Sequence, residues 1–474
     1  MSAAIRLPLT AGVALLALPA FALTPDAALP DLHGAELALL WGAPFAGLLL
    51  SIALAPLFVA DFWHRHYGKI AAAWALAFLV PFTLRFGATE TVHHVAHAFL
   101  LEYLPFVVIL FSLFTIAGGI CVRGSLVGTP ALNTGLLALG TALASVMGTT
   151  GASMLLIRPL LTATETRRHR VHVVIFFILL VGNVGGALSP LGDPPLFIGF
   201  LKGVDFFWTT QELARPTALV ATAVLAIFWV VDRWFHRKEA TPMPPVAARE
   251  RIALEGSVNF VLIAGVIGAV LLSGLWRPGV VFDVLGAHLQ LENLARDGLL
   301  VALALLSLAL TPRAVREHNQ FHWAPIAEVA KLFAGIFVTI IPVIAILAAG
   351  RDGALAGVIE LLVDPAGQPR NVMVFWTTGL LSAFLDNAPT YLVFFNLAGG
   401  EAGTLMGPLR ETLAALSMGA VYFGALTYIG NAPNFMIKAI AEDRGVAMPS
   451  FFAYMLYASV VLLPLMAVVS VLYL

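Results

Sequence analysis

Long apolar segments recur along almost the whole chain, and they limit the possible folds more than any other feature. From residue 37 to the C-terminus, stretches of roughly 20 apolar residues alternate with shorter polar ones, the length that a membrane-spanning helix needs. Of the 474 residues, 60% are hydrophobic and 11% are charged, and the mean hydropathy is +0.93. The sequence therefore predicts an all-α polytopic membrane protein and excludes a soluble globule.

Composition also excludes several kinds of site. A single cysteine, Cys121, rules out an intramolecular disulfide and a cysteine-rich metal or iron–sulfur centre. The formal net charge of −1 gives no basic surface for nucleic acid. We expect no cofactor beyond a transported or coupling ion, and we expect membrane lipid as the surrounding partner.

The N-terminal residues have the pattern of an export signal. Arg6 precedes an apolar stretch over 7–18, and Ala20-Phe21-Ala22 fits the small-x-small pattern that signal peptidase cleaves. A signal peptide over residues 1–22 is the prediction, with an uncleaved short membrane anchor as the alternative.

Basic residues set the orientation of the apolar segments. They gather at 64–69, 167–170, 233–251 and 313–316, and the positive-inside rule assigns these regions to the cytoplasm. The apolar segments are 37–60, 70–86, 99–122, 131–160, 171–201, 216–235, 255–275, 298–311, 326–349, 371–400, 410–440 and 452–473.

This orientation predicts two re-entrant helical hairpins and two discontinuous helices. Segment 131–160 must enter and leave on the cytoplasmic side, and 371–400 must do so on the opposite side. Segments 171–201 and 410–440 each cross once, interrupted by Gly, Pro and polar residues. The chain then divides into a first repeat over 23–235, a cytoplasmic linker over 236–254 and a second, inverted repeat over 255–474.

A motif shared by the two halves supports an internal repeat. The pattern G-A-L-[ST]-x-[LI]-G-[DN]-x-P-x-F occurs at 186–197 and again at 424–435, which are 238 residues apart. The two hairpin tips, 149–153 and 386–390, align at an offset of 237. Inverted repeats with interrupted helices are typical of secondary transporters that bind their substrate near the bilayer midplane.

Two aspartates stand at these breaks. Asp193 begins the second half of a broken helix and could act only as an N-cap, but a charge there is costly in a membrane and indicates a bound cation. Asp386 stands at a hairpin tip, where it could cap the following helix or pair with Arg158 or Lys438. We predict that both aspartates bind sodium or protons.

Hydroxyl and amide side chains surround the two aspartates in the sequence. Such hard oxygen ligands suit sodium or protons better than soft metals. The predicted cation and proton ligands are Asp193, Asp386, Asn387 and Asn431, and the predicted ion pathway adds Thr149, Thr150, Ser153, Ser189, Thr390, Thr427 and Asn434.

Other polar residues near these motifs have simpler interpretations. Asn183 is expected to form an interhelical hydrogen bond, and Gly185 and Gly186 to allow close helix contact. His93, His94 and His97 are expected on an exposed external loop; the alternative is a zinc site, although no HExxH motif is present.

These motifs carry a family resemblance. GNVGGALSPLGDPP in one half, with AFLDNAPTY and GNAPNF in the other, resembles the ion transporter superfamily, and within it the NhaD-type sodium/proton antiporters and related membrane proteins called citrate transporters. The resemblance implies a homodimer in which hairpins and broken helices move as a transport unit against a scaffold. Dicarboxylate carriers of the superfamily have Ser-Asn-Thr at their hairpin tips, whereas this chain has Gly148-Thr149-Thr150 and an aspartate at 386.

The resulting hypothesis is a sodium/proton antiporter of the bacterial inner membrane. The alternative is a sodium-coupled symporter of a carboxylate, such as citrate or a dicarboxylate, or of an oxyanion, in which a small anion is a further partner. An intramembrane enzyme is disfavoured because neither a GxSxG nor an HExxH motif occurs.

Overall fold

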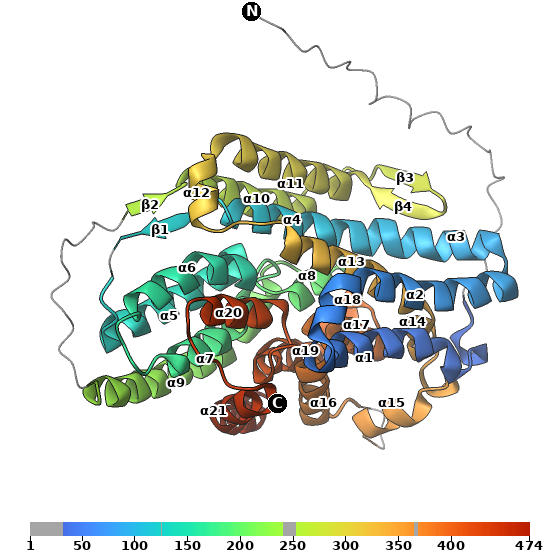
Figure 1. Cartoon of the computed structure of the whole chain (residues 1–474). Coiled ribbons are helices and arrows are strands. Elements are labelled where there is room, and N and C mark those ends of the chain that lie inside the picture. The colour runs from blue at the N-terminus through green and yellow to red at the C-terminus, as the bar shows by residue number, and fades with distance from the viewer. Residues whose placement is uncertain (1–31, 125, 240–252, 365–367) are drawn as a thin grey trace, which may run out of the picture. The chain divides into compact units, whose positions relative to one another are not determined.

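Helices form almost all of the regular structure in the computed structural model, which describes residues 32–124, 126–239, 253–364 and 368–474. The predicted signal segment over 1–22 and most of the predicted linker lie outside these residues. Residues His33–Leu474 form one unit by their contacts, and Figure 1 shows its elements in chain order.

Nine helices of the described chain are long and apolar enough to cross a membrane. A pair of shorter helices, bent by 43° at their junction, would make a tenth span if the pair crosses as one. The bent pair is α13 (Ala324–Thr339) with α14 (Ile341–Ala348). The other spans are α1 (Ala43–Phe58) with the preceding turn η2 (Leu39–Gly42), α2 (Ala60–Phe86), the continuous helix of α3 (Ala88–His97), η3 (Ala98–Tyr103) and α4 (Leu104–Ala117), α5 (Pro130–Met147), α7 (Val171–Leu180) with η4 (Val184–Leu188), α9 (Trp208–Arg237), α10 (Val258–Leu275), α11 (Leu291–Leu310) and α21 (Phe451–Tyr473).

Large apolar side chains point outward from several of these helices. Leu84 on α2, Leu275 on α10 and Val471 on α21 are each more than four-fifths exposed. Lipid accepts such side chains without cost, whereas water does not. The chain is a multi-pass membrane protein.

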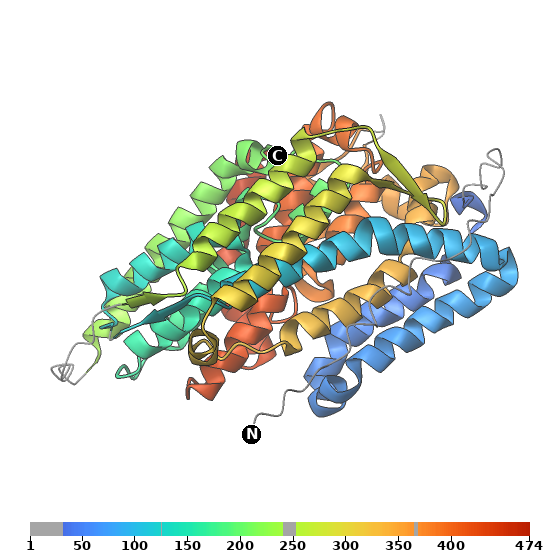
Figure 2. The same ribbon diagram turned by 90° about the horizontal axis from the view of Figure 1, so that it is seen from above.

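One group of helices packs beside the group that contains the interrupted helices. α10 lies beside α11, and α11 packs on α4, as Figure 2 shows from above. α1 and α13 both pack on α2. The group with the interrupted helices contains the most buried span, α7 with η4, whose most apolar window is 89% buried.

The helices of that group are interrupted at four places. α5 meets α6 (Thr149–Ala163) at Gly148, and α16 (Asn371–Leu385) meets α17 (Asn387–Leu397) at Asp386. A short turn separates η4 from α8 (Pro194–Leu201), and a short bend separates η6 (Gly424–Leu426), which follows α19 (Arg410–Phe423), from α20 (Ala432–Asp443). The interruptions lie inside the segments where the sequence predicts them.

The interruptions repeat at one constant offset. Gly148 (φ 81°, ψ 150°) and Asp386 (φ 73°, ψ 144°) have nearly the same backbone conformation and are 238 residues apart. Asp193 (φ −142°, ψ 142°) and Asn431 (φ −153°, ψ 140°) match in the same way, also 238 residues apart. The sequence alignment that paired Thr149 with Asp386 was therefore wrong by one residue, because the turn conformation, and not the residue type, fixes the correspondence.

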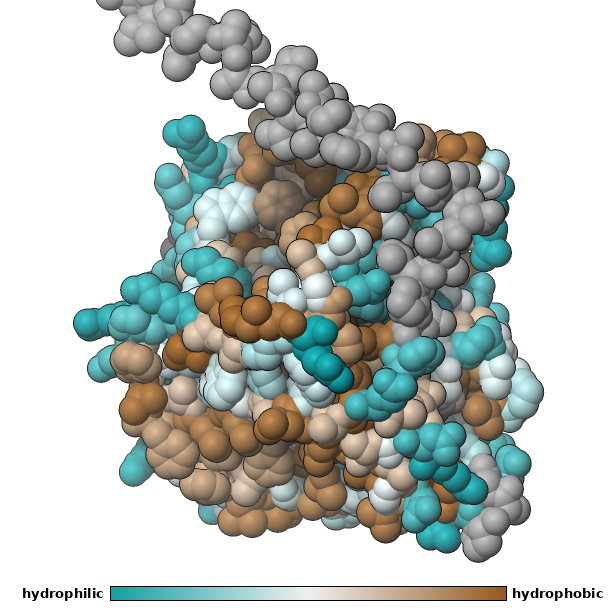
Figure 3. Space-filling model, turned by 90° about the vertical axis from the view of Figure 1, so that its right-hand side faces the viewer, coloured by the Kyte–Doolittle hydropathy of each residue, from teal (hydrophilic) through white to brown (hydrophobic). Residues whose placement is uncertain are grey.

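Short elements complete the chain. β1 (Cys121–Arg123) pairs antiparallel with β2 (Ala253–Glu255), with Cys121 opposite Glu255, and β3 (Val281–Val284) forms a hairpin with β4 (Ala287–Gln290). The remaining short helices are η1 (Gly34–Glu36), α12 (Arg313–His318), η5 (Gly350–Asp352), α15 (Ala356–Leu362) and α18 (Ala402–Met406). Figure 3 shows the end of the molecule at the right of Figure 1, where hydrophilic and hydrophobic side chains are mixed on the surface.

The prediction of an exposed histidine loop was wrong. His93, His94 and His97 lie on α3, because the π-helical turn η3 carries the helix on into α4 without a break. Across the described residues, no group of three His, Cys, Asp or Glu side chains is placed to hold a metal ion.

Candidate functional site

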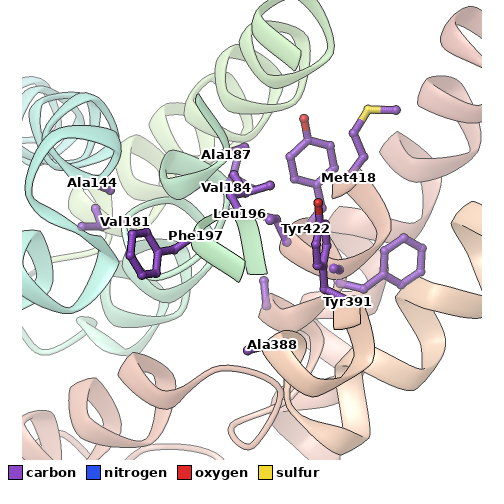
Figure 4. Close-up of a cluster of buried hydrophobic side chains, with 14 of the residues drawn as sticks. Ala144, Val181, Val184, Ala187, Leu196, Phe197, Ala388, Tyr391, Met418 and Tyr422 are labelled. Atoms are coloured by element: carbon purple, nitrogen blue, oxygen red, sulfur yellow. The ribbon is translucent and has the colours of Figure 1, made fainter. Parts of the chain in front are cut away.

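Apolar packing holds the interrupted helices together around the site. Figure 4 shows Val184, Leu196 and Phe197 from the first broken helix packed among side chains of α5, α17 and α19, including Ala144, Tyr391 and Tyr422. All six are buried. Close-packed surroundings of this kind fix the position of the polar groups at the breaks.

Glycines allow the first broken helix to fold back on itself. A Cβ on Gly192 would lie 2.1 Å from the carbonyl oxygen of Gly186, so only glycine fits there. The freed carbonyl of Gly192 accepts a hydrogen bond from the Thr149 amide at 2.8 Å. The tip of the α5–α6 pair is thereby attached to the break in the neighbouring helix.

Asp193 is the point at which all four interrupted elements meet. Its carboxylate accepts hydrogen bonds from Thr149 Oγ1 at 3.2 Å, Asn387 Nδ2 at 2.5 Å and Asn431 Nδ2 at 2.9 Å. These donors come from α6, from α17 and from the residue that precedes α20, and Asp193 itself is 1% exposed. Asp193 occupies the N-cap position of α8, but its side chain makes no capping hydrogen bond. The purely capping interpretation of Asp193 is therefore wrong.

A chain of amide side chains extends from Asp193 through both halves. Asn431 Nδ2 also lies 3.3 Å from Asn183 Oδ1, and Asn183 Nδ2 donates to Asn434 Oδ1 at 2.8 Å. Asn434 in turn donates to the carbonyl oxygens of Gly424 and Thr427. The predicted interhelical role of Asn183 is confirmed, and so is the close contact at Gly185, where a Cβ would lie 2.5 Å from the Thr141 carbonyl oxygen.

Asp386 has a different environment from Asp193. It is the N-cap of α17 and accepts a hydrogen bond from the Ala388 amide at 3.2 Å, so its predicted capping role is confirmed. Apart from this contact its carboxylate faces a cavity that Asp193 also lines. Both carboxylates therefore reach one shared space.

The alternative for Asp386, an ion pair with Arg158 or Lys438, is not formed. Arg158 donates to Asn319 and Gln320 at 3.2–3.3 Å, and Lys438 pairs with Glu442 at 2.7 Å. Among the described residues, neither Asp193 nor Asp386 has a lysine, arginine or histidine nitrogen within 4.0 Å. Asp193 is buried and Asp386 is half-buried, and both have neutral partners only, which is costly unless a cation or a proton joins them.

The cavity has a volume of about 420 Å³ and lies between the interrupted helices and α1, α2, α4 and α13. Of the predicted residues, those on its wall are Thr149, Thr150, Asp193, Asp386 and Asn431. Asn387 lies behind the wall and touches the cavity only through Asp193.

The remaining predicted pathway residues do not line the cavity. Ser189 donates to the carbonyl of Ser145, and Thr427 donates to that of Ala383, so each holds a helix break in place. Thr390 donates to the carbonyl of Asp386. Ser153 and Asn434 are fully buried behind the wall.

The sequence analysis missed several charged residues of the wall. Glu328 on α13, Asp443 at the end of α20, and His64 and His322 all line the cavity, together with Arg158. They come from segments far apart in the sequence and belong to no shared motif. Only the fold brings them to the wall.

Comparison with known proteins agrees with this architecture. Residues 34–474 match a family model described as "Putative citrate transport". The chain belongs to this family.

Two of three similar proteins carry transporter names. An uncharacterized transporter of Synechocystis sp. is 24% identical over 365 residues, covering 70% of this chain and 74% of that protein. An uncharacterized transporter of Mycobacterium tuberculosis is 24% identical over 327 residues, covering 67% and 71%. A 46 kDa membrane protein of Mycobacterium leprae is 24% identical over 328 residues, with the same coverage. The family and these relatives identify a secondary transporter and not an enzyme.

Proposed function

We propose that this family member exchanges sodium for protons through the cavity between its interrupted helices. The charge of the cavity wall carries the proposal. Four carboxylates line it, from Asp193, Glu328, Asp386 and Asp443, against one guanidinium, that of Arg158. When ionised, these carboxylates attract cations and repel a di- or tricarboxylate.

Asp193 and Asp386 have different positions and different hydrogen-bond partners in the cavity. Asp386 accepts a hydrogen bond from the Ala388 amide and lines the cavity, so an ion or proton in the cavity can reach its carboxylate. Asp193 lies deeper and is oriented by three neutral donors. Asn387 Oδ1 is buried without a hydrogen-bond partner in the described chain and is a free oxygen ligand for a sodium ion beside Asp193.

Competition for these carboxylates is sufficient for exchange. Sodium and protons neutralise the same two groups, whereas the empty site carries two buried negative charges and crosses the membrane barrier at a much higher cost. The matching breaks at 148 and 386, and at 193 and 431, support an inverted repeat in which the two pairs α5–α6 and α16–α17 are re-entrant hairpins. We place the protein in the bacterial inner membrane, as a homodimer, on its family resemblance.

The experiment is sodium-driven proton movement in liposomes. Purified protein is reconstituted with a pH gradient and a pH-sensitive dye, and sodium chloride is added without any organic anion. We expect sodium to dissipate the gradient and the Asp386→Asn and Asp193→Asn variants each to reduce the rate at least a hundredfold. A double Asn variant that remains active would refute the proposal.

One alternative retains support from the family description, which names citrate. A sodium-coupled carboxylate symporter would take up the carboxylate together with sodium, and sodium alone would leave the internal pH unchanged. Parallel liposomes given sodium with citrate, sodium with succinate, or sodium alone separate the two functions. Dependence on the anion would favour the symporter.

A further inference from the structure

Seven aromatic side chains line the cavity. They are Trp63 on α2, Phe106 and Phe114 on α4, Phe197 on α8, Phe333 on α13, and Tyr428 and Phe435 at the second broken helix. Phe106 and Phe333 stack with a centroid distance of 4.6 Å and an interplanar angle of 27°. Rings therefore approach the cavity from both sides.

A bare or hydrated sodium ion uses little of this wall. Sodium binds hard oxygen atoms, and the rings and aliphatic chains offer none. The cavity volume of about 420 Å³ also far exceeds the space for one or two ordered water molecules. Sodium alone does not explain the size or the chemistry of the wall.

We propose that the cavity also binds organic ammonium cations that have an apolar body, and that these compete with sodium for Asp386. Aromatic faces attract quaternary ammonium groups, and the attraction is stronger when the contact is desolvated. Carboxylates supply the countercharge, and the apolar body covers the remaining wall. The combination of unpaired carboxylates and aromatic rings in one cavity carries this assignment, which rests on the cation site of the proposed function.

The charges on the wall exclude other ligand classes. An organic anion would meet four carboxylates and one guanidinium that already donates to Asn319 and Gln320. A neutral apolar molecule would leave Asp386 without a countercharge. Tyr428 and Phe435 already contact one ammonium group of the chain, since the Lys438 Nζ lies 5.6 Å from the centre of Tyr428 and 5.7 Å from that of Phe435.

The test measures binding of phenyltrimethylammonium to the purified full chain. Trp63 lies in the wall and is 2% exposed, so its fluorescence can report a ligand in the cavity. We expect saturable binding that sodium displaces and that Asp386→Asn weakens at least tenfold. Tetramethylammonium, which has the charge without the ring, and tert-butylbenzene, which has the bulk without the charge, should each bind at least tenfold more weakly.

Ring removal separates aromatic recognition from general apolar burial. Phe333→Leu keeps an apolar side chain in the wall. It should weaken phenyltrimethylammonium binding about tenfold more than it weakens sodium binding. Phe452→Leu on α21 is the matched control, because Phe452 is 67% exposed and lies outside the cavity. This control should leave phenyltrimethylammonium binding unchanged.

The outcomes distinguish this inference from the proposed function. Sodium-driven proton movement without binding of phenyltrimethylammonium would overturn the inference and leave the antiporter intact. Binding that sodium does not displace would also overturn it, because the two cations would then occupy separate sites. Absence of any sodium-driven proton movement would overturn the proposed function, on which this inference rests.

Discussion

Asp386 holds a backbone conformation that normally requires glycine. Its φ of 73° and ψ of 144° match those of Gly148, which ends the corresponding helix in the first half. A side chain in this region costs about 1–3 kcal/mol, and such costs are found where a function requires the residue. The conformation indicates that Asp386 is retained for its carboxylate and not for stability.

Asp386→Gly tests this interpretation. The variant should unfold at a temperature at least as high as that of the unmodified protein, because relief of about 1 kcal/mol or more of strain exceeds the few tenths lost with the cap. Exchange activity should be lost. Thermal unfolding in detergent and the liposome assay measure the two effects, and a large drop in unfolding temperature would contradict the strain argument.

Asn387 connects the same hairpin tip to Asp193. Asn387→Ala removes the donor at 2.5 Å from Asp193 and the buried Oδ1 that we assign to sodium. We expect the apparent sodium affinity to fall about tenfold, since one oxygen ligand and one orienting hydrogen bond are lost together. Proton release measured at increasing sodium concentrations gives this affinity. An unchanged affinity would show that Asn387 is not a sodium ligand.

At the scale of elements, a buried cluster fixes the base of the first helix pair to α9. The Asp232 carboxylate on α9 lies 2.6 Å from Arg167 Nη2 and 2.8 Å from His172 Nε2. It also accepts a hydrogen bond from Asn133 Nδ2 at 3.0 Å. The three partners belong to the segment after α6, to α7 and to α5. Asp232 is fully buried and remote from the cavity wall, so its role is structural.

Asp232→Asn should destabilise the protein by about 3 kcal/mol, because it leaves the Arg167 charge buried without its countercharge. Glu212→Gln is the comparison, since Glu212 faces the mainly exposed Arg410 at 3.7 Å and contributes about 0.5 kcal/mol or less. Unfolding by heat or denaturant gives both values. Equal effects of the two substitutions would show that the cluster is not an anchor.

A second contact joins the first broken helix to the neighbouring group of helices. Lys202, directly after α8, pairs with Glu102 at 2.6 Å, and Glu102 lies in the π-helical turn η3. If α8 moves with the transport unit while η3 stays with the scaffold, this ion pair breaks in every cycle. Its strength then sets part of the barrier between the two states.

Glu102→Gln should raise the exchange rate about fivefold, because it removes a half-buried pair worth about 1 kcal/mol that otherwise breaks in each cycle. The double variant Glu102→Lys with Lys202→Glu restores the pair with exchanged charges and should return the rate toward its original value. Stopped-flow fluorescence of the pH dye measures the rates. A double variant whose exchange rate stays at that of Glu102→Gln would contradict a role for this contact in the transition.

At the scale of the whole molecule, the orientation in the membrane follows from the basic segments. The end of α9 is expected in the cytoplasm and the β3–β4 hairpin on the other side. Single cysteines in a Cys121→Ser background test this arrangement. Arg277→Cys should react with an impermeant thiol reagent added to intact cells, whereas Arg237→Cys should react only after the membrane is opened. The reverse labelling would invert the topology.

The sequence by itself predicted the membrane class, the helical interruptions and the residues of the two central carboxylates. Apolar length is enough to identify a span, and Gly and Pro inside such a span are enough to place a break, because both are local properties of the chain. The twelve predicted segments agree with the observed helices within a few residues at most ends, and Asp193 and Asp386 both reach the cavity.

Only the tertiary structure decided which polar residues line the cavity and which hold the helix breaks in place. Ser189, Thr427 and Asn434 have the same chemistry as Thr149 and Asn431, yet they bond to backbone carbonyls or lie behind the wall. Glu328 and Asp443 reached the cavity without any motif. Residue type determines what a side chain can bind, but the partner that it meets depends on packing between segments hundreds of residues apart, which no local pattern records.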